Sequence, residues 1–245
     1  MPLAKRIIPT LLIRGRQLVK GKQFNAWRSV GHVGQAVRIH QARGVDELVI
    51  CDISATPEGR GPNLELIEEL TKDCFMPLAV GGGVRTVEDV KTLLRAGADK
   101  VVIGRGAHSE STLISDCRRT VGSQAVVVAI DVKHGQVRHM GAGPGPARWA
   151  QWMQDVGAGE ILLTSVEREG TLQGFDLEMI HAVSRAVSIP VIAHGGCGSY
   201  EDMRLAIEAG ADAVAAGALF QFSDCTPRGA AEYLAEHGIE TRIAA

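Results

Sequence analysis

Two long segments of this 245-residue chain repeat each other at a constant offset of 113 residues. The first runs from Pro77 to Ala107 and reads PLAVGGGVRTVEDVKTLLRAGADKVVIGRGA. The second runs from Pro190 to Phe220 and reads PVIAHGGCGSYEDMRLAIEAGADAVAAGALF. The period is too long for one unit of a solenoid, because such units span about 20–50 residues. A half-barrel that has been duplicated and closed on itself explains the repeat.

Short apolar runs alternate with amphipathic stretches along the chain. The predicted strands are Arg6–Ile13, Glu47–Ile53, Pro77–Val80, Lys100–Ile103, Gln124–Val132, Glu160–Ser165, Pro190–Ala193 and Ala213–Ala216. The clearest predicted helices are Asn63–Asp73, Val87–Ala96, Glu201–Ala209 and Pro227–His237. Eight alternations predict a parallel (β/α)8 barrel, with an open doubly wound sheet as the alternative. No linker divides the chain, so we expect residues 1–245 to form a single α/β barrel domain.

The composition fits a parallel barrel. Hydrophobic residues make up 45% of the chain and aromatic residues only 4%, so the core must consist mainly of Val, Ile, Leu and Ala. Strands buried on both faces favour such side chains. A net charge of −2 provides no field for nucleic acid or an anionic membrane, although a small anionic ligand needs only local donors.

Nothing in the sequence predicts export or a membrane span. Residues 1–10 lack the apolar stretch of a signal peptide, and no run of about 18 uncharged apolar residues occurs. The five cysteines are odd in number and lack CxxC spacing, which favours a reducing cytoplasm over a disulfide framework or a zinc site. We expect no metal and no other cofactor.

Each repeat places consecutive glycines at a strand end, where a barrel carries its active site. Loop amides and helix N-termini at this end bind phosphate, and glycine permits close approach of the backbone. Thr86 and Ser199 are placed as N-caps of the helices that follow. Tight strand–helix turns are the alternative explanation, but two related copies favour two phosphate sites and a substrate with phosphates at both ends. The first cup comprises Gly82, Gly83 and Gly104, and the second cup comprises Gly195, Gly196 and Gly217.

Several ionisable residues end strands or begin loops at the same face. Asp131 ends the fifth strand, and proton transfer by a partly desolvated carboxylate is the functional alternative to a structural cap. The pseudo-symmetric position of the first strand is Leu12, which cannot move protons. Asp52 ends the second strand and Glu169 follows the sixth. Lys20 lies on the first loop, either as a ligand of an anion or as an ordinary loop lysine.

Charged residues of alternating sign begin four of the predicted strands at the opposite face. Each could simply be solvated, but together they can pair across the barrel axis. Such a ring would close or gate the narrow end of the barrel. The four residues are Arg6, Glu47, Lys100 and Glu160.

Taken together, these motifs resemble the cyclase subunit of imidazole glycerol phosphate synthase over nearly the whole chain. The resemblance is carried by AKRIIP, the VKG of the first loop, PLAVGGGVRTVEDVKTLLRAGADKV, GSQAVVVAID and GAGEILLTS. It implies a barrel that receives ammonia from a partner glutaminase docked on the N-terminal face. It also implies Asp131 as a catalytic aspartate and the four-residue ring as the ammonia gate. By position, the candidate substrate- and phosphate-binding residues are Lys20, Gly82, Gly83, Gly104, Arg105, Gly170, His194, Gly195, Gly196 and Gly217. Arg105 is either a new ligand of an anion or a plug.

The chain departs from the family pattern around the active site. The other catalytic aspartate falls at Leu12, and Gly104-Arg105 replaces an Asn-Thr pair. Serines of the second phosphate site are replaced by His194 and Ala218. Losing one member of an acid–base pair typically costs roughly 10²–10⁴-fold in rate.

Three hypotheses follow from the kept ring and the altered active-site end. The first is a cyclase-like subunit of a glutamine amidotransferase that serves an amidation outside histidine synthesis, as in a branch of the family that resembles partners in acetamidino-sugar formation. The second is an imidazole glycerol phosphate synthase that uses Asp131 together with Asp52 or Glu169. The third is a non-catalytic scaffold that activates a glutaminase.

Overall fold

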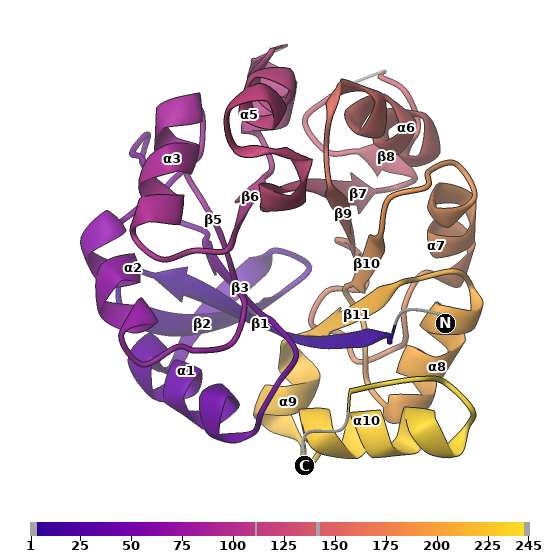
Figure 1. Cartoon of the computed structure of the whole chain (residues 1–245). Helices are drawn as coiled ribbons and strands as arrows, with labels where there is room; N and C mark the ends of the chain where they lie inside the picture. The colour runs from indigo at the N-terminus through magenta and orange to yellow at the C-terminus, as the bar shows by residue number, and fades with distance from the viewer. Residues whose placement is uncertain (1–3, 111, 141–142, 243–245) are drawn as a thin grey trace.

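The chain forms a closed barrel of eight parallel strands surrounded by helices (Figure 1). The computed structural model describes residues 4–110, 112–140 and 143–242. Neighbouring strands pair in chain order, and β11 pairs with β1 to close the barrel. The (β/α)8 barrel is therefore confirmed and the open sheet is excluded. The barrel strands are β1 (Arg6–Arg14), β4 (Leu48–Asp52), β5 (Leu78–Gly81), β6 (Lys100–Ile103), β7 (Val126–Lys133), β9 (Glu160–Ser165), β10 (Val191–His194) and β11 (Ala213–Ala216).

In the described part of the chain, eight helices cover the outside of the barrel. Their apolar faces pack against the strands, as Val90 and Leu93 of α3 illustrate. Short helices α4 (Gly106–Ser109) and α9 (Ala218–Phe222) follow β6 and β11, at equivalent places in the two halves. The outer helices are α1 (Val33–Ala42), α2 (Leu64–Thr71), α3 (Val87–Arg95), α5 (Leu113–Val121), α6 (Pro146–Val156), α7 (Leu177–Ser184), α8 (Tyr200–Glu208) and α10 (Pro227–Glu236), and a 3-10 turn, η1 (Ser123–Ala125), precedes β7.

The duplicated segments fold alike down to individual hydrogen bonds. Thr86 caps α3 by accepting from the Asp89 amide at 3.1 Å, and Ser199 caps α8 through the equivalent contact at 3.1 Å. The Asp99 carboxylate accepts from the Leu78 amide at 2.8 Å, and the matching contact in the second segment is 3.1 Å long. The predicted bounds agree with the structure to within about two residues.

Side chains inside the barrel stack in layers, because every second residue of a strand points inward. The middle of the barrel is apolar and packed, and several of its members are small. The described residues of this inner cluster are Ile8, Val49, Ala79, Val102, Val127, Leu162, Ile192, Ala213 and Ala215. By the same alternation, Arg6 and Lys100 lie one layer below them, and Thr10, Asp131, Thr164 and His194 lie above them.

A β-hairpin extends the sheet beyond the barrel, where the sequence predicted only a loop. Strands β2 (Gln17–Lys22) and β3 (Asn25–His32) follow β1 directly, and β2 pairs with it antiparallel. A further two-residue strand, β8 (Gln136–Val137), pairs with the end of β7. None of the helices in the described part of the chain has the length and apolarity needed to cross a membrane.

Candidate functional site

A cavity of about 390 Å³ opens at the carboxyl ends of the strands, which we call the mouth. The cavity lies mainly over the half of the barrel that includes β1 and β4–β7. Its lining contains both aspartates predicted at strand ends and the whole first cup. The predicted site residues that line it are Asp52, Gly82, Gly83, Gly104, Arg105, Asp131 and His194.

The two aspartates in the cavity differ in their surroundings. Asp52 accepts from the Ser54 amide at 3.0 Å, from the Ser54 hydroxyl at 2.8 Å and from the Arg60 guanidinium at 2.7 Å. Both of its oxygens are therefore engaged in holding the loop after β4. Burial raises the pKa of Asp131 to about 6, although Arg138 and a contact with the Thr164 hydroxyl act to lower it. Asp131 is therefore the better candidate for an acid–base group at neutral pH.

Cationic side chains surround the cavity although the chain as a whole is slightly acidic. Arg105 contacts the His139 ring at 3.3 Å, and Arg85 donates to the Arg60 carbonyl at 2.9 Å. Burial and the neighbouring charges lower the pKa of His108, whose ring stacks on Trp149. The mouth thus offers a local positive field to an anion. The cationic and imidazole side chains of the lining, besides His194, are Arg14, Arg85, Arg105, His108, Arg138 and His139.

The hairpin brings two aromatic rings to the cavity. Phe24 and Trp27 lie with ring centroids 6.4 Å apart and both line the mouth. The Arg138 guanidinium lies 5.3 Å from the Phe24 ring centroid, and Arg14 lies 5.8 Å from that of Trp27. These contacts join the hairpin to the rest of the rim across the mouth.

The turn itself requires the glycines of the first cup, whether or not a ligand binds there. Gly82 and Gly83 have φ angles of 110° and 75°; a Cβ at Gly82 would overlap with the Asp52 backbone at the end of β4, and one at Gly83 would overlap with the loop after β4. Both the turn explanation and the phosphate explanation therefore remain compatible with the geometry. Gly104 directly follows β6 instead of ending it, and Arg105 places an exposed guanidinium beside it.

The second cup is occupied by the protein itself, and Lys20 is not an ordinary loop lysine, which was one of the two roles predicted for it. Lys20 belongs to β2, is 1% exposed, and lies so close to Gly217 that a Cβ there would overlap with the ammonium group. Its Nζ has no hydrogen-bond partner in the described structure. Gly195 packs on the Ser165 backbone, and the Gly196 carbonyl accepts from the Gly174 amide at 2.8 Å.

A buried ionisable cluster lies beside Lys20. Glu169 is 4% exposed, and its Oε2 lies 3.7 Å from Nε2 of His194. The Nδ1 atom of the same imidazole lies 3.2 Å from the Thr164 hydroxyl. Gly170 has a φ of 72° and packs against the hairpin, since a Cβ there would overlap with the backbone at position 21. Glu169 therefore contacts His194 but does not itself line the cavity, and Gly170 supports the loop.

The four predicted charges form a closed ring at the N-terminal end of the barrel. Arg6 Nη1 lies 2.6 Å from Glu47 Oε2 and 3.2 Å from Glu160 Oε2. Lys100 Nζ lies 2.9 Å from Oε2 of Glu47 and 2.9 Å from Oε1 of Glu160. Glu47 precedes β4 by one residue instead of beginning it, yet its side chain is only 3% exposed. The ring closes this end below the apolar layer.

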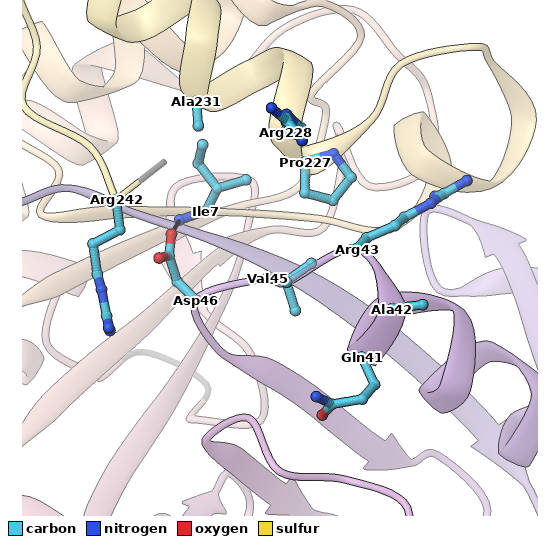
Figure 2. A pocket seen from close by; sticks show the side chains of 11 residues that line it. Ile7, Gln41, Ala42, Arg43, Val45, Asp46, Pro227, Arg228, Ala231 and Arg242 are labelled. Atoms are coloured by element: carbon cyan, nitrogen blue, oxygen red, sulfur yellow. Dashed lines mark hydrogen bonds between the residues drawn. The ribbon is translucent and has the colours of Figure 1, made fainter. Parts of the chain in front are cut away.

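A second hollow, of about 200 Å³, lies beside the first residues of β1 and β4 (Figure 2). It is bounded by the end of α1, the following loop and the start of α10. Its carboxylate, Asp46, accepts from the Ile7 amide at 3.0 Å. No group of three metal-ligating side chains occurs in residues 4–110, 112–140 and 143–242. These observations leave the mouth as the place with the richest acid–base chemistry.

Comparison with known families identifies the family of the chain. A model of the family described as histidine biosynthesis protein matches residues 6–226. The chain belongs to the histidine biosynthesis protein family. This family comprises catalytic (β/α)8 barrels of isomerase and cyclase type. The match confirms the family relationship that the motifs suggested; the cyclase subunit and its divergent branch stay predictions.

Reasoning from the sequence missed most of the cationic rim. Arg85 directly follows GGGV in the first repeat, so its position after a strand end was a usable signal. Arg138, His139 and the aromatic pair of the hairpin gave no such signal, because they reach the mouth through the paths of β8 and β2–β3.

Proposed function

We propose that this chain is the synthase-type barrel of a glutamine amidotransferase, acting in an amidation other than histidine synthesis. A partner glutaminase would dock on the N-terminal face, and its ammonia would pass through the charge ring to a phosphorylated substrate in the mouth. The closed four-residue ring is the observation that carries this proposal. Binding a substrate at the mouth does not require four charges inside the opposite end of the barrel.

The ring has the properties of a gate. Its two acids and two bases neutralise one another, and each carboxylate bridges both cations. Desolvated ion pairs of this kind seldom add stability over apolar packing, so their presence favours a function. Above the ring, the apolar layer of Ile8, Val49, Val102 and Leu162 would admit neutral ammonia more readily than an ion.

The mouth supports an anionic substrate and a proton-transfer step. The first cup and Arg105 offer backbone amides and a guanidinium to one phosphate. Asp131 supplies a carboxyl group with a raised pKa beside that phosphate site. Leu12 also lines the cavity, where the family resemblance places the second catalytic aspartate. This replacement is the reason for assigning the chain to a different amidation.

The free thiols fit the proposed location in the cytoplasm. None of the five cysteines, all of which lie in described parts of the chain, is in a disulfide. A reducing compartment maintains cysteines in this state.

The test combines the purified chain with the glutaminase from the same genome. We expect a complex by sedimentation velocity and a higher rate of glutamine hydrolysis in it than in the glutaminase alone. With ammonia and the histidine-pathway nucleotide intermediate, the chain should show negligible cyclase turnover. Absence of a complex would refute the amidotransferase pairing, and turnover equal to that of an authentic cyclase would refute the separate amidation.

The second candidate is the imidazole glycerol phosphate synthase reaction itself. The position of Asp131 in the cavity, with its raised pKa, favours it, as does membership of the family. In this case Asp131→Asn should abolish cyclase turnover, whereas Leu12→Asp should change it little. Glutaminase activation without any ligand binding in the mouth would instead identify the non-catalytic scaffold.

A further inference from the structure

The two cups of the barrel mouth differ in what fills them. The first cup borders the open cavity, together with Arg105 and Asp131. The second cup borders the buried cluster of Lys20, Glu169 and His194. Symmetry of the backbone therefore does not extend to the side chains.

We propose that the half of the mouth formed by β9–β11 is an acid–base site instead of a second phosphate site. His194 is the proton-transfer partner of Asp131, and the substrate carries a phosphate at one end only. The inference rests on the proposed function in one respect, namely that the mouth is where the substrate reacts.

The geometry connects the two acid–base groups through one hydroxyl. Asp131 and Thr164 are register partners on the adjacent strands β7 and β9, so their side chains leave the barrel wall side by side. The Thr164 hydroxyl lies 3.2 Å from Nδ1 of His194, and all three residues line the cavity. A hydroxyl group donates one hydrogen bond and accepts others, so it can link a carboxyl group to an imidazole.

The proton transfer balances without any further reactant. Protonated Asp131 donates to the Thr164 oxygen while the Thr164 hydroxyl donates to Nδ1 of neutral His194. When the hydroxyl proton moves to Nδ1 and the carboxyl proton moves to the hydroxyl oxygen, Thr164 is restored. The products are the Asp131 carboxylate and the imidazolium of His194.

The residues around His194 set the balance between the neutral imidazole with protonated Asp131 and the imidazolium with the Asp131 carboxylate. Glu169 lies 3.7 Å from Nε2 and stabilises the imidazolium, whereas the buried Lys20 ammonium acts against it. Burial itself lowers the pKa of His194, which is 6% exposed. Thr164 and Asp131 approach from β9 and β7, Glu169 from the loop after β9, and Lys20 from the hairpin. The cluster therefore holds a neutral imidazole with one stabilising carboxylate within reach.

The same cluster fills the second cup with side chains of the protein. The Lys20 ammonium lies over Gly217, where the loop after β11 would receive an anion. The Glu169 carboxylate beside it would repel a phosphate. Neither Lys20, Glu169 nor Gly217 lines the open cavity. One phosphate at the first cup and a reacting group near Asp131 and His194 fit this arrangement.

The first experiment follows the titration of His194 in the full chain labelled with ¹⁵N-histidine. Signals of the eight histidines are recorded from about pH 5 to 9 by long-range ¹H–¹⁵N correlation, and His194→Asn assigns the signal. Asp131→Asn and Glu169→Gln should each lower the proton affinity of His194, by about tenfold for the nearer Glu169. Thr164→Val should reduce the effect of Asp131→Asn, because the carboxylate then acts on His194 only through space.

Glu167→Gln is the matched control, because Glu167 lies in the same loop but is exposed and contacts His134. It should leave the His194 titration unchanged. A titration of His194 that is the same in wild type, Asp131→Asn and Thr164→Val would overturn the proposal. A purely structural histidine would give this result.

The second experiment counts inorganic phosphate by isothermal titration calorimetry. We expect one phosphate per chain, at least tenfold weaker binding in Arg105→Gln, and unchanged binding in His194→Asn. Two phosphates per chain, one of them lost in Lys20→Met, would overturn the proposal. Binding of no phosphate would refute the phosphorylated substrate of the proposed function, and the His194 titration would then decide the acid–base assignment alone.

Discussion

Removing the charge of Glu47 tests whether the basal ring is one coupled unit. Glu47 is 2% exposed and contacts both cations of the ring, at 2.6 Å from Arg6 and 2.9 Å from Lys100. In Glu47→Gln, two largely buried cations share one remaining carboxylate, Glu160. Leaving a buried charge without its partner costs about 3–5 kcal/mol.

For a chain of this size, each kcal/mol corresponds to about 2–4 °C in Tm, so Glu47→Gln should lower Tm by about 6–20 °C. Urea unfolding followed by circular dichroism measures the free energy directly. Glu69→Gln is the control, because the Arg16–Glu69 pair has equally short contacts but side chains that are 46% and 50% exposed. Exposed pairs contribute little, so this control should resemble wild type.

A double variant separates charge coupling from loss of packing. Replacing Glu47 by Leu and Lys100 by Met removes one acid and one base, leaving the Arg6–Glu160 pair intact. Apolar replacement of a buried pair is often neutral, so the double variant should regain much of the stability lost in Glu47→Gln. The reasoning is refuted if Glu47→Gln costs no more than Glu69→Gln.

Three further predictions concern stability. Burial raises the pKa of Asp131 to about 6, so the folded chain binds this proton more tightly than the unfolded chain. Asp131→Asn should therefore increase the free energy of unfolding by about 3 kcal/mol above pH 6 and give no gain near pH 4. Urea unfolding measures this difference. Burial lowers the pKa of His40 to about 4, so the unfolded chain binds a proton at higher pH than the folded chain. The free energy of unfolding of the wild type should therefore fall by about 3 kcal/mol between about pH 6.5 and pH 4. His40→Leu should abolish this loss. Thr86→Ala should cost about 1 kcal/mol in thermal unfolding. Thr112→Ala should cost less, because the Thr112 side chain accepts no hydrogen bond from a helix amide.

The prediction for Asp131 has a functional meaning. Groups with strongly perturbed pKa values cluster at functional sites, and Asp131 lines the cavity. Asp52 differs, because its oxygens already hold Ser54 and Arg60. The sequence placed both aspartates at strand ends, and only the resemblance to the cyclase family favoured Asp131 over Asp52.

The amino-acid sequence by itself determined the barrel and its ring. Eight apolar runs and a repeat from Pro77 and Pro190 fixed the number and order of the strands. Because side chains of a strand alternate between its faces, charges at equivalent strand starts can point to one axis. Both features depend only on spacing along the chain, which is why Arg6, Lys100 and Glu160 met as predicted.

Only the tertiary structure decided what each half of the mouth can do. The path of the hairpin carries Lys20 over Gly217, and packing of separate loops brings Glu169 to His194. The engagement of Asp52 by Arg60 likewise depends on a loop whose course no periodicity encodes. Loops are positioned by contacts between residues distant in sequence, so repeated glycine motifs revealed two related backbones but not their different side-chain chemistry.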